Sequence, residues 1–163
     1  KDREEALRKL KWLATQNVEF VEQPMAAERI DDQRWLHERS PLPLFADEAC
    51  LHAEAIPQLA GLYDGVVIKL DKCGGIFPAL RMIHVARAHR LKILLGCMVS
   101  SSVTITAAAH LAPLVDYVDL DGNLLIANDP FQGVTVEKGR LVLPTRPGLG
   151  LTPRPGAPGA AVH

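Results

Sequence analysis

Residues 65–75 of the chain read GVVIKLDKCGG. An apolar run rich in β-branched residues ends here at Lys69, and a charged turn with two glycines follows. Because no polar side chain interrupts the run, we expect a strand that is covered on both faces, as parallel strands are. The carboxyl ends of such strands are where parallel α/β folds build their sites. The segment therefore predicts a parallel α/β protein with a candidate functional side chain at Lys69.

The same pattern recurs along the chain at nearly constant spacing. Further strands are expected at residues 18–22, 43–46, 92–96 and 116–119, and consecutive strands begin 22 to 27 residues apart. Amphipathic stretches fill the gaps, which suits strand–helix units and not hairpins. An open doubly wound sheet and a (β/α)8 barrel both fit. The glycine fingerprint of dinucleotide-binding folds is absent, and a whole barrel needs eight units and roughly 250 residues.

The C-terminal part of the chain departs from this pattern. Residues 131–143 indicate a hairpin, and five of the 12 prolines lie between positions 144 and 158. We therefore expect a partial (β/α)-barrel domain of about five βα units over residues 1–130. A C-terminal hairpin and closing segment would follow over 131–150, and an irregular, disordered tail over 151–163.

Composition excludes several classes of function. The 163 residues include 18 Lys and Arg and 19 Asp and Glu, a formal net charge of -1, so neither nucleic acid nor an anionic membrane surface is an expected partner. The apolar runs are too short to span a bilayer, and no secretory leader opens the chain. Three scattered cysteines indicate free thiols in a reducing cytoplasm. We expect a cytoplasmic protein.

Charged side chains follow most of the predicted strands. Glu22 and Asp47 end successive strands, and both are the hard oxygen ligands that Mg2+ prefers. Either one alone is more typical of a cap or a surface charge, but together they favour a metal site. Two interpretations of Lys69 are open as well. It can extend its ammonium group to solvent, or it can act as a base if a nearby cation and partial burial lower its pKa.

The last predicted strand carries a carboxylate pair. Asp119 and Asp121 are two residues apart, so an extended segment would place both on one side. A catalytic dyad and a site for a substrate ammonium group fit this pair equally well. Asp116, at the strand entrance, is expected to be structural. Lys72 is expected to bind a neighbouring carboxylate or solvent, and the serines at 100–102 are expected to cap a helix.

These motifs, in this order, resemble the enolase superfamily, and within it the muconate-lactonizing-enzyme subgroup and its dipeptide epimerases. The resemblance covers about residues 1–150. It rests on VEQP at 21–24, ADE at 46–48, IKLDKCGG at 68–75, GCM at 96–98 and DLD at 119–121.

The resemblance implies a reaction. A lysine base acting with Mg2+ is the general pattern of the superfamily. Lys69 corresponds to one of two catalytic lysines, and Glu22 and Asp47 to two of three metal-binding carboxylates. The implied activity is Mg2+-dependent epimerisation of a dipeptide at an α-carbon, with proton abstraction and return through an enediolate. The enzyme would therefore be an isomerase.

The resemblance also implies a substrate site. Asp119 and Asp121 match the Asp-x-Asp motif that holds the α-ammonium group of a dipeptide in the epimerases. Cys97 and Met98 match the unit beside it and are assigned to substrate binding. Ser100 stands where some epimerases have an acidic residue.

Several family features do not occur in this sequence: the N-terminal capping domain, the other catalytic lysine and the first metal-binding aspartate. We therefore expect the C-terminal portion of a longer enzyme, one that forms a homo-oligomer when full length. Two alternatives remain open. One is another activity of the superfamily, an N-succinylamino-acid racemase, o-succinylbenzoate synthase or cycloisomerase. The other is an inactive barrel fragment that binds a partner chain through its open sheet edges.

Overall fold

The computed structural model describes residues 2–155. Five parallel strands form one sheet with the strands in chain order. They are β1 (Val21–Glu22), β2 (Leu44–Ala46), β3 (Gly65–Lys69), β4 (Lys92–Gly96) and β5 (Tyr117–Val118). All five lie where the sequence predicts them, although β1 and β5 are shorter than expected.

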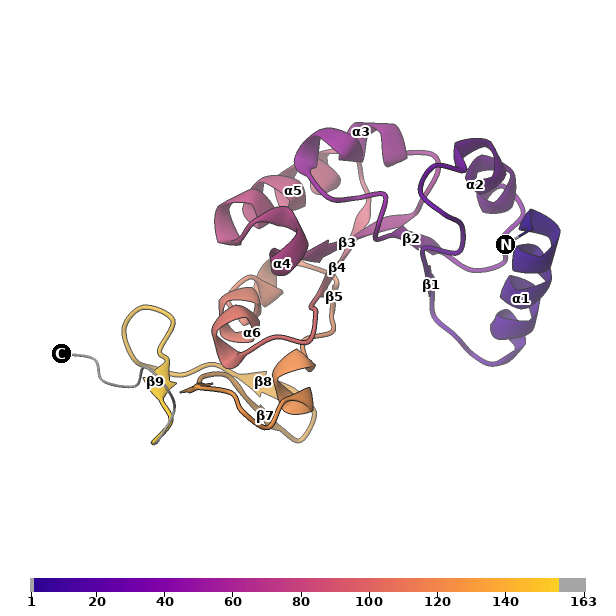
Figure 1. The fold of residues 1–163 in the computed structure, drawn as a ribbon. Helices are drawn as coiled ribbons and strands as arrows, with labels where there is room; N and C mark the ends of the chain where they lie inside the picture. The colour runs from indigo at the N-terminus through magenta and orange to yellow at the C-terminus, as the bar shows by residue number, and fades with distance from the viewer. Residues whose placement is uncertain (1, 156–163) are drawn as a thin grey trace.

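Helices cover the convex side of the sheet and form an arc around it (Figure 1). They are α1 (Arg3–Thr15), α2 (Ile30–His37), α3 (Ile56–Leu59), α4 (Leu70–Cys73), α5 (Ile76–Ala88) and α6 (Ser102–Ala109). Short 3-10 turns occur at Ala53–Ala55, Ala112–Leu114 and Gly122–Leu125. The sheet is curled, so the described part of the chain is about half of a (β/α) barrel, as the sequence predicts.

Side-chain alternation along the strands separates two apolar clusters. One face of β2, β3 and β4 packs against the helices and forms the main core; its residues are Leu44, Ala46, Val66, Ile68, Ile93 and Leu95. The opposite face carries Phe45, Val67 and Leu94, with Phe20 and Tyr117 packed against them. This second cluster lies on the concave side, which would be the interior of a closed barrel.

Three aromatic rings fill the base of the concave side. The ring of Phe20 lies 4.5 Å from that of Phe45 and 4.9 Å from that of Tyr117, measured between centroids. Such tilted pairs add to the stability gained from burial alone. Gly65 makes room for this layer, because a Cβ atom there would overlap the ring of Phe45. The glycine that begins β3 is therefore required by close packing.

The C-terminal part forms two small antiparallel sheets. The predicted hairpin is β7 (Thr135–Glu137) with β8 (Arg140–Val142). The expected tail differs at its start, because β9 (Thr152–Pro153) pairs with β6 (Phe131–Gln132). The rest of the predicted tail, residues 156–163, lies outside the described residues. Within 2–155, no helix has both the length and the apolar character needed to cross a membrane.

The N-terminus of α6 is capped from a distant part of the chain. The serines at 100–102 were expected to provide the cap, but Ser101 at the N-cap position makes no side-chain cap hydrogen bond. Asp129 takes this role instead: its Oδ2 accepts from the backbone N of Ser102 at 2.9 Å and from the Ser102 hydroxyl at 2.6 Å. This contact fastens the chain after β5 to α6.

Candidate active site

The polar residues of the site lie one step above the aromatic layer. Along a strand, the residue two positions after an inward side chain faces the same side. The residues two positions after the five members of the concave cluster (Phe20, Phe45, Val67, Leu94 and Tyr117) therefore face the same side. They are Glu22, Asp47, Lys69, Gly96 and Asp119. All of them are at or just after the carboxyl ends of the strands, so the site predicted from the sequence lies at one mouth of the half barrel.

Glu22, Asp47 and Lys69 come together in the structure. Nζ of Lys69 lies 2.8 Å from Oδ2 of Asp47 and 3.2 Å from Oε1 of Glu22. Gly96 on the neighbouring strand leaves space for this lysine, because a Cβ atom there would lie 3.1 Å from Lys69 Cε. Three adjacent strands thus place two carboxylates around one ammonium group.

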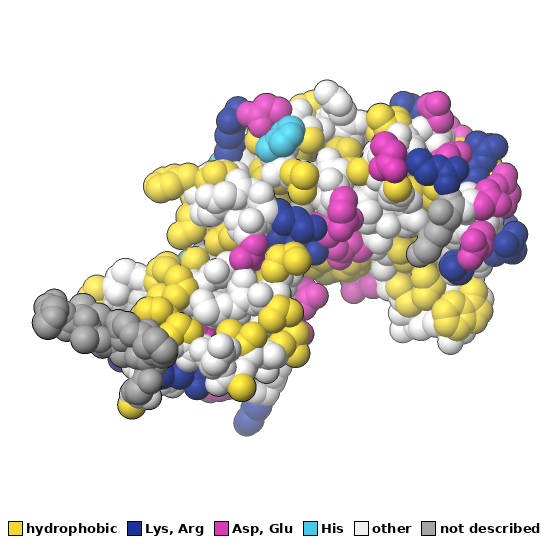
Figure 2. Space-filling model, in the orientation of Figure 1, with side chains coloured by type: hydrophobic (Ala, Val, Ile, Leu, Met, Phe, Trp, Pro, Cys, Tyr) yellow, Lys and Arg dark blue, Asp and Glu magenta, His cyan; other side chains and the backbone are white. Residues whose placement is uncertain are grey.

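A second lysine joins the cluster from α4. Nζ of Lys72 lies 2.8 Å from both carboxylate oxygens of Asp47 and 3.5 Å from Oε1 of Glu48. The expectation that Lys72 binds a neighbouring carboxylate is confirmed, and that carboxylate is Asp47. Figure 2 shows basic and acidic side chains side by side near the middle of the face in view.

Burial and charge pairing act in opposite directions on these groups. Burial opposes ionisation of Asp47, but hydrogen bonds from Lys69 and Lys72 hold the pKa of this carboxyl below its usual value. Burial of Lys69 is likewise outweighed by Asp47 and Glu22, so the pKa of the lysine is raised, the opposite of the lowering expected from the sequence. The pKa of Glu22 is raised, first by burial and then by its hydrogen bond with Asp47. The cluster holds Asp47 as a carboxylate and Lys69 as an ammonium group.

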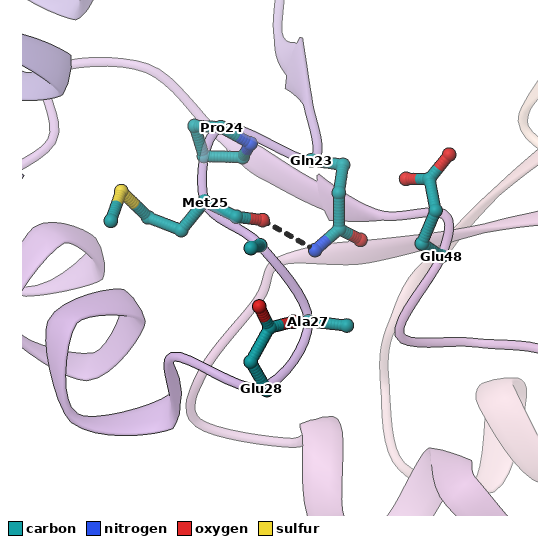
Figure 3. A pocket seen from close by; sticks show the side chains of 7 residues that line it. Gln23, Pro24, Met25, Ala27, Glu28 and Glu48 are labelled. Carbon is teal, nitrogen blue, oxygen red and sulfur yellow. Dashed lines mark hydrogen bonds between the residues drawn. The ribbon is translucent and has the colours of Figure 1, made fainter. Parts of the chain in front are cut away.

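Gln23 supports Asp47 from the next position in the chain after Glu22, a role that the sequence analysis missed. Its Oε1 accepts from the backbone N of Asp47 at 2.8 Å, and its Nε2 donates to the Met25 carbonyl at 2.8 Å and to the Tyr63 hydroxyl at 3.0 Å. Gln23 has a φ of 40°, which is uncommon for a residue with a side chain. Figure 3 shows this amide beside Glu48, at a cavity of about 420 Å³ that the β1–α2 loop lines.

The predicted substrate-binding residues form a second group around β4 and β5. Sγ of Cys97 is 4.0 Å from Oδ1 of Asp121, and Gly122 packs directly against the carbonyl of Met98. Asp119, Asp121 and Met98 are all exposed. The structure therefore brings Cys97, Met98 and Asp121 together beside the lysine cluster.

One detail of this group differs from expectation. Asp119 and Asp121 were predicted to share one side of an extended segment. Instead β5 ends at Val118, and Asp121 is the N-cap of the following 3-10 turn with φ -101° and ψ -4°. The turn brings Gly122 so close to the Met98 carbonyl that a Cβ atom there would overlap it, and Asp119 and Asp121 therefore do not share one side of a strand.

The carboxylates of Glu22, at the end of β1, and Asp47, just after β2, form a donor set that suits Mg2+. They already share one cation, the Lys69 ammonium group, and Mg2+ is commonly held by one or two carboxylates with water and substrate oxygens. Within residues 2–155, no group of three or more His, Cys, Asp or Glu side chains could hold a metal ion. Further ligands would have to come from elsewhere.

A curled parallel sheet with charged groups at its carboxyl ends is the architecture of a (β/α) barrel. The model of the family described as "Enolase C-terminal domain-like" matches residues 1–157, and the chain belongs to this family.

Two similar proteins within this family are epimerases. The chain is 48% identical over 149 residues to an L-Ala-D/L-amino acid epimerase of Pedosphaera parvula, a match that covers 90% of this chain and 43% of that protein. A dipeptide epimerase of Enterococcus faecalis, solved with Mg and the dipeptide L-Leu-L-Tyr, matches with a TM-score of 0.85 and 32% identity over 91% of this chain and 44% of that one.

A third relative has a different substrate. The N-succinyl Arg/Lys racemase of Bacillus cereus matches with a TM-score of 0.86 and 32% identity, over 94% of this chain and 43% of that one. The chain thus spans about two fifths of the length of the curated relatives that it matches.

Proposed function

We propose that the protein carrying this chain is a Mg2+-dependent isomerase that epimerises a dipeptide at an α-carbon. The observation that carries the proposal is the Lys69 ammonium group, held by carboxylates of two neighbouring strands at the mouth of the half barrel. The similarity to epimerases of Ala-containing dipeptides supports the substrate class. The chemistry requires a group that gives up and takes up a proton beside a site for the substrate carboxylate. Lys69, held here as an ammonium group, would return a proton in this form and would act as the base after losing it.

The residues of the chain divide the work. Lys69 Nζ would remove the α-proton on one face of the substrate or return it there. Glu22 and Asp47 would hold Mg2+, which supplies positive charge for the substrate carboxylate as negative charge develops on it. Lys72 and Gln23 keep Asp47 in place through the hydrogen bonds described above. Asp119 and Asp121 would accept hydrogen bonds from the substrate ammonium group.

A racemase acting on N-acylated amino acids is the second candidate function. The similarity to the N-succinyl Arg/Lys racemase favours it, because that protein shares the fold at comparable identity. An N-acylated substrate has no α-ammonium group for Asp119 and Asp121 to bind.

The cytoplasmic location and the homo-oligomeric state of the full-length protein stay predictions.

Proton exchange at the α-carbon tests the assignment of Lys69. In D2O, the full-length enzyme should exchange the α-proton of an L-Ala-containing dipeptide for deuterium. Proton NMR measures this exchange as a loss of the α-proton signal. Lys69→Met should reduce epimerisation by about 10²–10⁴-fold, the usual contribution of a general base. Lys11→Met, which removes an exposed lysine of α1, is the matched control and should leave turnover unchanged. Full turnover by folded Lys69→Met protein would refute the role.

A further inference from the structure

A second cavity lies between α2 and α3, apart from the lysine cluster. Its volume is about 430 Å³, and it reaches from the helices to Glu48, just after β2. Neither Asp47 nor Lys69 lines it. Its walls include three aliphatic side chains, Ile30, Leu59 and Leu62. Cavities of this size are typical of sites for small organic molecules.

A buried side chain with an unpartnered acceptor lies in the wall of this cavity. The side chain of Gln33 is held on one side, where Nε2 donates to the Leu62 carbonyl at 2.8 Å. Gln33 is only 2% exposed, and its Oε1 has no hydrogen-bond partner within the described residues. Leaving a buried acceptor unpaired costs about 1–3 kcal/mol, so such groups normally have a partner. The Gln33 side chain is therefore one hydrogen-bond donor short, at the wall of the cavity.

Charges of both signs stand on the same cavity. Arg34, on the next position of α2, is exposed and makes no ion pair among residues 2–155. The Glu48 side chain is 60% exposed, and among residues 2–155 its ion pair is the 3.5 Å contact with Lys72. A cation would suit Glu48 and Gln33 but be repelled by Arg34, and an anion would do the reverse. A ligand with both charges satisfies all three groups.

We propose that this cavity binds a small zwitterion with an aliphatic side chain, either a free α-amino acid or a short peptide. Its ammonium group donates to Gln33 Oε1 and pairs with Glu48, while its carboxylate pairs with Arg34. The side chain lies against the aliphatic wall. This site is additional to the proposed epimerase site and does not depend on that function.

Calorimetric titration of the full-length protein with L-leucine tests the proposal. Leucine should bind, whereas N-acetyl-L-leucine and L-leucinamide, which each lack one charge, should bind at least about tenfold more weakly, a loss of 1.4 kcal/mol. Gln33→Met and Arg34→Met should weaken leucine binding to a similar degree. Arg8→Met removes an exposed arginine of α1 and is the matched control. It should bind leucine as the wild type does.

The dipeptide L-Ala-L-Leu distinguishes the two sources of ligand. If a short peptide is the occupant, the wild type should have one more binding site for the dipeptide than Arg34→Met has. At that site the dipeptide should bind more tightly than leucine does. Arg34→Met should keep epimerase activity, which separates this cavity from the lysine cluster. Because Arg34 is exposed, this variant should fold even if Gln33→Met does not. Leucine and dipeptide binding that is absent, or unchanged in Arg34→Met, would overturn the proposal and leave only water at Gln33.

Discussion

The ring of Phe20 lies 4.9 Å from the ring of Tyr117, although the two residues belong to opposite edges of the five-stranded sheet. A flat sheet of five strands could not bring its edges this close, because neighbouring strands lie nearly 5 Å apart. The contact is therefore possible only because the sheet is curved. It also forms the floor beneath Glu22 and Asp119, each of which follows one of these rings by two residues.

Removing the first ring should destabilise the fold. Phe20 is half-buried and contacts two other aromatic rings, so we expect Phe20→Ala to lower the free energy of unfolding by about 2–3 kcal/mol. Urea denaturation of the full-length protein measures this change. Phe77→Ala is the control, because Phe77 is 84% exposed and should matter by less than about 0.5 kcal/mol. Equal effects of the two changes would show that the aromatic floor does not stabilise the sheet.

The sequence was sufficient to predict the strands and the residues that follow them. Continuous apolar runs and their spacing identified β3 and β4 to the residue, because both strands are long and covered on both faces. The short β1 and β5 were overestimated, since only the central strands have neighbours on both sides that prolong the hydrogen-bond ladder. The positions of Glu22, Asp47 and Lys69 followed from parallel topology alone.

Mg2+ binding should depend on Glu22. Because the Glu22 and Asp47 carboxylates share one cation in the structure, Glu22→Gln removes half of the negative charge that this chain offers the metal. We expect the Mg2+ affinity of the full-length protein to fall by about tenfold or more, because even mutation of a residue that only supports a metal ligand typically costs that much affinity. Calorimetric titration with MgCl2 measures it. Glu28→Gln changes an exposed carboxylate of the β1–α2 loop and should leave the affinity unchanged; a loss shared by both variants would point to nonspecific electrostatics.

Asp116 should make the stability of the fold depend on pH. Its carboxylate accepts from the backbone N of Ile93 at 2.9 Å, from Arg87 at 2.6 Å and from Lys92 at 3.1 Å, which confirms the predicted structural role. Burial opposes ionisation, but these partners together lower the pKa of Asp116 below its value of 3.8. A lowered pKa means stability that is present above about pH 4 and lost as the pH falls through the folded-state value.

The variant Asp116→Asn isolates this charge, because the amide oxygen can still accept from Ile93. We expect it to cost about 1–2 kcal/mol at pH 7, and the difference from wild type to shrink as the pH falls below 4. Urea titrations at several pH values provide the measurement. Asp31→Asn on the exposed face of α2 serves as control. A difference that stays constant down to pH 2 would mean that the charge is not responsible.

Contacts between distant segments are the part of the site that the sequence could not supply. Nothing in the pattern around Lys72 says that both of its contacts at 2.8 Å go to Asp47, because Lys72 lies in a short helix that was not predicted. The capping of α6 by Asp129, 27 residues away, is equally invisible to local rules, which favoured the adjacent serines. Gln23 appears in a quoted motif, but nothing local predicts its φ of 40° or that its Oε1 accepts from the backbone N of both Asp47 and Ala49.

Asp121 should distinguish a dipeptide epimerase from a racemase of N-acylated amino acids. Its carboxylate is exposed and lies 4.0 Å from Cys97 Sγ, in the part of the mouth proposed to bind the substrate. A dipeptide would present an ammonium group there, and an ammonium–carboxylate hydrogen bond is among the strong ones.

In the full-length enzyme, Asp121→Asn should raise the KM for a dipeptide by about tenfold or more and leave Mg2+ affinity unchanged. N-acetylation of the dipeptide should cost the wild type a similar factor and cost the variant little more, since both changes remove the same contact. Steady-state kinetics with the four combinations of enzyme and substrate measure this coupling. If the wild type turns over free and acetylated dipeptides equally well, the ammonium site is wrong and the N-acylated substrate becomes the better assignment.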